Sequence, residues 1–272
     1  MSTAPATPPH DRFRHWATTI IAQHYAAGRA GHHAQGTREL YQSSTMGALL
    51  DGVYVGDVTI AEILRHGDFG LGTFNHLDGE MVILDGVCYH LHADGSTTVA
   101  ADSERTPFAA VTRFRTDLTF EITESTNRVD AVAQIDSLIG SENLMYAIRI
   151  NGGFSEMRTR TVMAQSPPYP PLIKATESQA ETRFTDVTGA LAGFRLPYYD
   201  QGISVAGYHL HFLDENRNQG GHALDFQLSH GTVSVCTLSD LHLSLPGTPE
   251  FLGANLATAD ADEQICQAEG GH

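Results

Sequence analysis

Three histidines in the C-terminal half of the chain have the spacing of a metal site. His209 and His211 are separated by one residue, and His222 follows eleven residues later. Alternate side chains of a β-strand share a face, so His209 and His211 would point the same way from one strand. Three imidazoles that converge on one point suit a divalent metal with an open coordination position, and an open position permits chemistry.

The residues between His211 and His222 favour a β-hairpin. Residues 214–221 are polar and end in two glycines, which makes a turn long enough to return the chain antiparallel. His222 would then open a second strand, at residues 222–226, beside the first. The sequence therefore predicts that the three imidazoles meet on one hairpin.

Glu215 leaves a second interpretation open. It has the same strand parity as His209 and His211, and the resulting His-x-His-x3-Glu pattern is close to the first metal motif of cupins. Such a site would favour iron or manganese and oxygen chemistry. Its neighbours Asp214 and Asn216 instead favour a solvated turn residue, and the second cupin motif is not visible downstream.

Four other residues could contribute chemistry if the fold carries them to the histidines. Glu80 follows an Asp-Gly turn and precedes a strongly apolar strand, where a solvated strand end is the ordinary interpretation. Arg158 and Arg160 alternate on a strand, and an arginine in a pocket would clamp a carboxylate through two hydrogen bonds. Glu269 lies four residues from the chain end, where a tail residue would normally be solvated.

A second His-x-His pair, His90 and His92, has no third histidine near it in sequence. We interpret it as an exposed or hydrogen-bonded pair on one strand of a hairpin. Residues 81–84 and 87–92 would form that hairpin around Asp85-Gly86, a strong turn signal.

The surrounding elements indicate an α/β arrangement, α+β-like, with mixed sheets in two packed domains. β-like runs include 49–55, 108–114, 145–150 and 182–194, and helices are expected at 16–27, 59–65 with Asp57 as cap, and 129–139. The Pro-rich stretch at 166–171 is the best candidate boundary. We therefore expect an N-terminal extension at 1–36, partly disordered, a mixed-sheet domain at 37–165, and a metal-binding domain at 166–272.

Composition excludes several function classes. The formal net charge of -16 argues against a nucleic-acid surface and against docking on anionic membranes. Lys174 is the only lysine, which disfavours Schiff-base chemistry. The three cysteines are scattered, so we expect no disulfide framework and a reduced, cytoplasmic setting. Residues 16–27 are too short to span a bilayer.

Taken together, long stretches of this chain resemble the bacterial alpha-acetolactate decarboxylase family. The likeness runs over about residues 37–270, and residues 1–36 lie outside it. The similar stretches are 41–46 (YQSSTM), 49–54 (LLDGVY), 67–81 (GDFGLGTFNHLDGEM), 207–214 (GYHLHFLD) and 220–222 (GGH).

The resemblance implies a zinc-dependent carboxy-lyase that converts 2-acetolactate to (R)-acetoin and CO2, in acetoin and butanediol biosynthesis. The ketone of acetolactate is β to its carboxylate, so loss of CO2 can proceed through an enediolate without pyridoxal or thiamin. It also implies two packed α/β domains and a homodimer. The implied roles are zinc ligation for His209, His211 and His222, catalysis by Glu80 and Glu269, and substrate binding by Arg160.

Two alternatives remain at this stage. A cupin-like metal-dependent oxygenase would contain iron, consume O2 and require Glu215. A zinc-stabilised module without enzymatic activity would have a closed fourth ligand and no carboxylates in a pocket.

Overall fold

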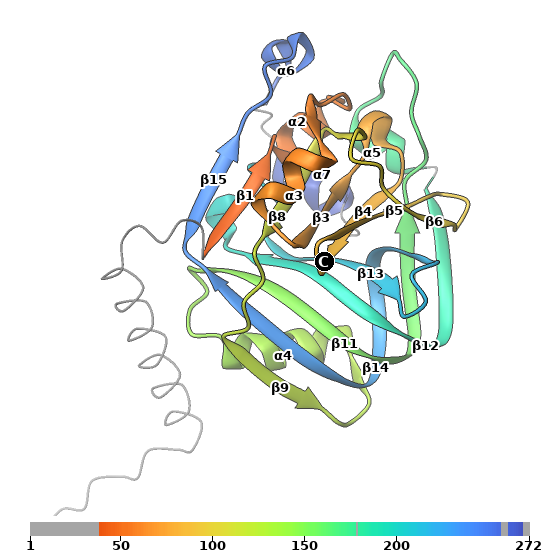
Figure 1. The fold of residues 1–272 in the computed structure, drawn as a ribbon, viewed down its shortest axis with the longest axis vertical. Helices are drawn as coiled ribbons and strands as arrows, with labels where there is room; N and C mark the ends of the chain where they lie inside the picture. The colour runs from red at the N-terminus through yellow and green to blue at the C-terminus, as the bar shows by residue number, and fades with distance from the viewer. Residues whose placement is uncertain (1–37, 178, 257–260, 269–272) are drawn as a thin grey trace, which may run out of the picture.

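The structure, a computed structural model, describes residues 38–177, 179–256 and 261–268. It is a mixed α/β fold made mostly of strands, as expected, and two large sheets pack against each other (Figure 1). The extension expected at 1–36, with its helix at 16–27, lies outside the described residues.

The first sheet has the order β15-β1-β8-β3-β4-β5-β6 within the described residues. Its pairs are antiparallel except for β1 and β15, which run parallel at one edge. The expected hairpin around Asp85-Gly86 is confirmed as β4 and β5. The strands are β1 (Glu39–Ser43), β3 (Phe69–Thr73), β4 (Glu80–Leu84), β5 (Val87–Leu91), β6 (Thr97–Val99), β8 (Phe108–Thr112) and β15 (Asp240–Ser244), beside a small ribbon of β2 (Val58–Thr59) and β7 (Arg105–Thr106).

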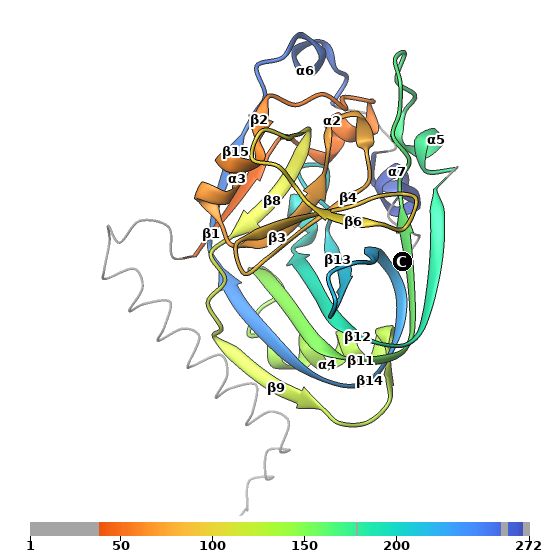
Figure 2. The same cartoon turned by 45° about the vertical axis from the view of Figure 1, so that its right-hand side comes forward.

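The second sheet curves until it closes on itself. β14 pairs with β11, β11 with β12, and β12 with β13, while the end of β13 pairs with the start of β14. Figure 2 shows β11, β12 and β14 bending along their length. The strands are β9 (Leu118–Ile122), β10 (Thr126–Asn127), β11 (Met145–Thr161), β12 (Ala180–Leu196), β13 (Gly207–Asp214) and β14 (Gly220–Leu238).

Short helices cover the sheets. α4 (Arg128–Leu138) buries Ala131 and Ile135 against the second sheet, while α2 (Met46–Leu50), α5 (Leu172–Thr176) and α7 (Ala261–Ala268) gather at one end of the molecule. No helix in the described part of the chain is long and apolar enough to cross a membrane. The remaining helical segments are α3 (Ile60–His66), α6 (Pro249–Gly253), η1 (Asn75–Leu77) and η2 (Tyr198–Asp200).

Two local expectations at the N-terminal side were wrong. The β-like run at 49–55 begins inside α2, because the Thr45 hydroxyl accepts from the Ala48 amide and caps a helix there. The cap of α3 is Thr59 and not Asp57, since Thr59 and Glu62 form a reciprocal capping box.

The sheets divide the chain at a different point from the boundary expected at 165–166. That boundary falls between β11 and β12, which pair with each other over almost their whole length. The chain passes from the first sheet to the second between β8 and β9, and β15 returns to the first sheet near the end. The sheets also share one apolar core, in which Val82 and Phe69 pack with Ala147 and Phe194.

Phe212 tests how much the closed second sheet depends on its interior packing. It is fully buried on β13, and its ring meets Phe154 edge-on at 5.5 Å. We expect Phe212→Ala to lower the free energy of unfolding by about 3–5 kcal/mol, because the cavity cannot collapse between paired strands. Leu252→Ala, at a side chain that is 75% exposed, should change it by less than about 0.5 kcal/mol. Equal urea midpoints for the two variants would contradict this account.

Candidate metal centre

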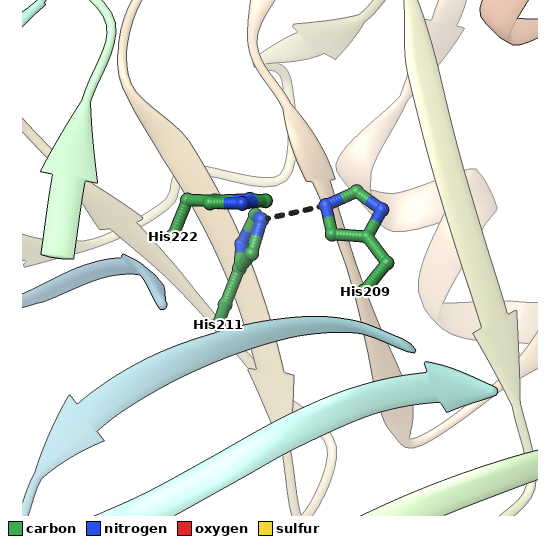
Figure 3. Close-up of side chains that lie close together, drawn as sticks. All are labelled: His209, His211 and His222. Carbon is green, nitrogen blue, oxygen red and sulfur yellow. Dashed lines mark hydrogen bonds between the residues drawn. The ribbon is translucent and has the colours of Figure 1, made fainter. Parts of the chain in front are cut away.

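The three histidines converge where β13 meets β14. His211 and His222 are direct partners in the antiparallel register, and His209 lies two residues earlier on the same face of β13. One ring nitrogen from each histidine lies within 4.8 Å of the others. The Nε2 atoms of His209 and His211 are 3.2 Å apart (Figure 3). The predicted hairpin and the convergence of its histidines are therefore confirmed.

Local sequence explains the tight connection between these strands. Asp214 is buried, and its Oδ1 accepts from the amides of Asn218 and Gln219, which closes the turn. A side chain at Gly220 would put its Cβ 2.1 Å from the Phe212 carbonyl oxygen. Glu215 is an exposed residue of this turn, so the turn interpretation is confirmed over the cupin-like one.

Hydrogen bonding and burial set the protonation of the cluster. His211 Nδ1 donates to the Met81 carbonyl at 2.8 Å, and since a carbonyl only accepts, the lone pair of His211 is on Nε2, the atom that faces His209. Burial, and then the charge of Arg160, lower the pKa of His209 to about 3. His209 is therefore neutral near pH 7, which is the form that ligates metals.

The ring nitrogens of His209, His211 and His222 form a donor set that fits a divalent metal. All three rings are buried, their ring centroids are 5.0–5.3 Å apart, and no backbone shift is needed to bring their nitrogens together. Three imidazole ligands leave a fourth position for substrate, which is the pattern of catalytic rather than structural zinc sites.

A cavity beside the histidines also receives Glu80 and Arg160. Glu80 opens β4 in the first sheet, and its Oε2 lies 3.7 Å from His211 Nε2. Arg160 lies near the end of β11, opposite His222 in the register, and donates to Gln179 Oε1 at 3.0 Å. The rest of the lining is largely apolar and includes Met46, Leu49, Leu77, Phe108, Val162 and Leu172.

Not every predicted site residue is placed in this cavity. Arg158 lines a separate depression with Arg183 and lies 3.8 Å from Glu181, so β11 presents only Arg160 to the histidines. A break in the β11–β14 register falls directly after Arg158, where the two arginines cease to be equivalent. Glu269 lies outside the described residues, which resume only for α7 up to Ala268.

Sequence reasoning missed Gln179 and the apolar wall. Gln179 follows α5 in a segment with no motif, so no sequence signal pointed to it. The wall residues are ordinary apolar side chains from several segments, and only the packing of α2, α5 and the η1 turn around the cavity separates them from the rest of the core.

Comparison with known proteins places this chain in a family. Residues 40–258 match the family model described as Alpha-acetolactate decarboxylase. The chain belongs to the alpha-acetolactate decarboxylase family. It is 45% identical to the alpha-acetolactate decarboxylase of Bacillus subtilis strain 168 over 88% of this chain and 94% of that protein. It is 46% identical to that of Klebsiella aerogenes over 85% and 88% of the two chains.

Solved structures of alpha-acetolactate decarboxylases share this fold. The crystal structure of the Bacillus subtilis strain 168 protein superposes with a TM-score of 0.84, covering 85% of this chain and 99% of that one at 45% identity. A Staphylococcus aureus protein described as similar to alpha-acetolactate decarboxylase gives a TM-score of 0.82 at 36% identity. The arrangement of the two sheets is therefore that of the family.

The donor set makes a prediction about metal content. We expect His222→Ala to lower the content of bound divalent metal at least tenfold, because two imidazoles bind a metal much more weakly than three. His230→Ala is the matched control, since His230 is an exposed residue of the same strand. Plasma emission spectrometry after dialysis measures the metal content of both variants, and full metal occupancy in His222→Ala would refute the site.

Proposed function

We propose that this chain decarboxylates 2-acetolactate to (R)-acetoin and CO2. The observation that carries the proposal is the cavity, which combines three buried imidazoles with one carboxylate and one guanidinium against an apolar wall. Membership of the alpha-acetolactate decarboxylase family supplies the substrate class. The presence of Glu80 in the cavity also disfavours a module in which the metal is purely structural, because such a module would need no carboxylate there.

His209, His211 and His222 would hold the metal, which we propose to be zinc. When bound there, zinc would supply a Lewis acid for the ketone and hydroxyl oxygens of the substrate. The hydrogen bond that His211 Nδ1 donates to the Met81 carbonyl keeps one imidazole oriented for this role, and hydrogen bonds of this kind sustain both the orientation and the basicity of a metal ligand.

Arg160 would bind the substrate carboxylate. Its side chain is buried beside the histidines, and the bond to Gln179 fixes the guanidinium at the cavity. A planar guanidinium holds a carboxylate through two parallel hydrogen bonds, which sets the direction of the bond that must break. This orientation lets CO2 leave while the electron pair of the broken carbon–carbon bond moves toward the ketone.

Glu80 and Glu269 would manage the proton. After the carbon–carbon bond breaks, its electron pair is taken up by the neighbouring carbonyl group, and the former carboxyl-bearing carbon then needs one proton. Glu80 opens β4 from the sheet opposite β13, so it approaches the cavity from one side only. Delivery from a single side would give acetoin of one handedness, and the family resemblance assigns Glu269 the companion role.

The apolar wall would exclude water and accommodate the two methyl groups of acetolactate. Leu77, Val162 and Leu172 are buried around the polar groups, so charges inside the cavity interact through a medium of low dielectric constant.

We also propose, from the family resemblance, that the protein works as a cytoplasmic homodimer.

The direct test is incubation of the zinc-loaded protein with racemic 2-acetolactate. Acetoin is measured by its colour reaction and its handedness by chiral gas chromatography, with heat-treated protein as the blank for spontaneous decarboxylation. Zinc-dependent formation of (R)-acetoin supports the proposal. Absence of acetoin above the blank from protein with full zinc content would refute it.

Arg160→Lys should lower kcat/KM at least a hundredfold while zinc content stays unchanged, because a lysine cannot bind a carboxylate in bidentate fashion. Arg158→Lys is the matched control on the same strand, and it should retain kcat/KM within about threefold. Similar values for the two variants would remove Arg160 from substrate binding.

Glu269→Gln should keep full zinc content and lose most of kcat, on the order of a hundredfold, because a general acid contributes roughly that much. Glu263→Gln, an exposed residue of α7, serves as the control for a charge change in the same segment. An unchanged kcat in Glu269→Gln would reduce this residue to a role in packing.

A further inference from the structure

The turn that leads into Glu80 has an unusual backbone. His76, Leu77 and Gly79 all have positive φ, at 69°, 56° and 76°. Positive φ is unfavourable for residues with a side chain, and it is especially so for leucine. A turn of this kind keeps its shape only where neighbouring groups hold it. The position of Glu80 therefore depends on what binds the turn.

Two side chains bind the backbone directly before Glu80. The Thr73 hydroxyl donates to the Gly79 carbonyl at 2.7 Å, and His90 Nε2 donates to the Asp78 carbonyl at 2.6 Å. Gly79 has no room for a side chain, since a Cβ there would lie 2.2 Å from the Leu91 carbonyl oxygen. His90 thus contacts the turn at the point where it joins β4.

The side chain of His90 is fixed by ring contacts and by polar groups at both of its nitrogens. It is buried, and its ring stacks on Phe74 at 3.7 Å and lies 3.9 Å from the ring of His92. Nδ1 lies 3.1 Å from Glu104 Oε1, and the other oxygen of Glu104 accepts from the Ala101 amide. The Asp78 carbonyl can only accept, so Nε2 carries a hydrogen whether or not His90 is charged.

His90 is also the direct strand partner of Met81 in the β4–β5 register. The Met81 carbonyl accepts the hydrogen bond that orients His211. The segment from Asp78 to Met81 therefore supports both Glu80 and one histidine of the metal centre, and His90 contacts that segment at its start and lies across from its end.

The close approach of Asp78, His90 and His92 could also suggest a second metal site, since ligand atoms of the three lie within 4.8 Å of one another. His90 Nε2 donates to the Asp78 carbonyl and so has no lone pair for a metal, and Nδ1 faces Glu104 Oε1 at 3.1 Å. The ring of His90 is also stacked on Phe74, with 3.7 Å between the ring centroids. This geometry fits a hydrogen-bonded support better than a pair of ligands.

We propose that His90 is a positioning residue for Glu80, acting through the Asp78 carbonyl and backed by Glu104. The proposal rests on the catalytic role of Glu80 under the proposed function. Its effect is on kcat rather than on substrate or metal binding, because His90 pairs with Met81 through the strand backbone, which a side-chain change leaves in place. The His90 side chain itself lies on the face of the first sheet away from the cavity, with Met81 and Phe74.

Three variants test whether His90 positions Glu80. His90→Phe keeps a flat ring against Phe74 and removes the donor to Asp78. His90→Gln retains an amide donor in a similar place. His92→Phe is the matched control, because it keeps the ring beside His90 and loses only a hydrogen bond to the Thr98 hydroxyl.

In the zinc-loaded protein we expect His90→Phe to lower kcat tenfold to a hundredfold, since small displacements of a catalytic group have effects of roughly that size. KM and zinc content should stay within about twofold, His90→Gln should recover most of kcat, and His92→Phe should match the wild type. An unchanged kcat in His90→Phe, an equal loss in His92→Phe, or a second zinc equivalent that His90→Phe abolishes would overturn the proposal.

Hydrogen–deuterium exchange separates this proposal from the proposed function. Peptides covering residues 75–83 should exchange faster in His90→Phe than in the wild type or His92→Phe. If the wild type makes no acetoin but His90→Phe still exchanges faster, the proposed function is refuted and the support of the turn by His90 is retained. Normal exchange with normal kcat in an active enzyme would refute only the role of His90.

Discussion

The hydrogen bond between His211 and the Met81 carbonyl joins the two sheets at the site. His211 belongs to the closed second sheet and Met81 to the first, so this bond fixes how far β13 lies from β4. It also fixes which nitrogen of His211 faces the other histidines. Because Glu80 immediately precedes Met81, the same contact brings a carboxylate from one sheet beside the imidazoles of the other.

Burial determines the protonation of His209 and makes hydrogen-bond partners necessary for the polar groups of the site. His209 cannot take up a proton near pH 7, since it is enclosed and faces the charge of Arg160. A buried set of imidazoles next to one cation and one carboxylate is costly unless the groups have hydrogen-bond partners. The bonds to Met81 and Gln179 show how the fold supplies partners for part of the set.

The histidine hairpin was predictable because all its determinants are local. Strand alternation puts His209 and His211 on one face, and Asp214 with Gly220 and Gly221 forms the turn that returns His222. The helix predicted at 129–139 is confirmed as α4, whose N-terminus is capped locally by the Asn127 side chain. Residues 49–55 were misassigned because the cap at Thr45 precedes the run and outweighs its β-like composition.

The sequence by itself determined the three-histidine hairpin, the acidic and lysine-poor composition, and, through long motifs, the family. Tertiary structure decided which further groups meet the histidines. Glu80 and Arg160 lie far from the hairpin in the chain, and they arrive because β4 packs across from β13 and β11 pairs with β14. It also separated Arg160 from Arg158, and His90 from the metal centre, because burial and hydrogen-bond partners are properties of the packed fold and not of residue spacing.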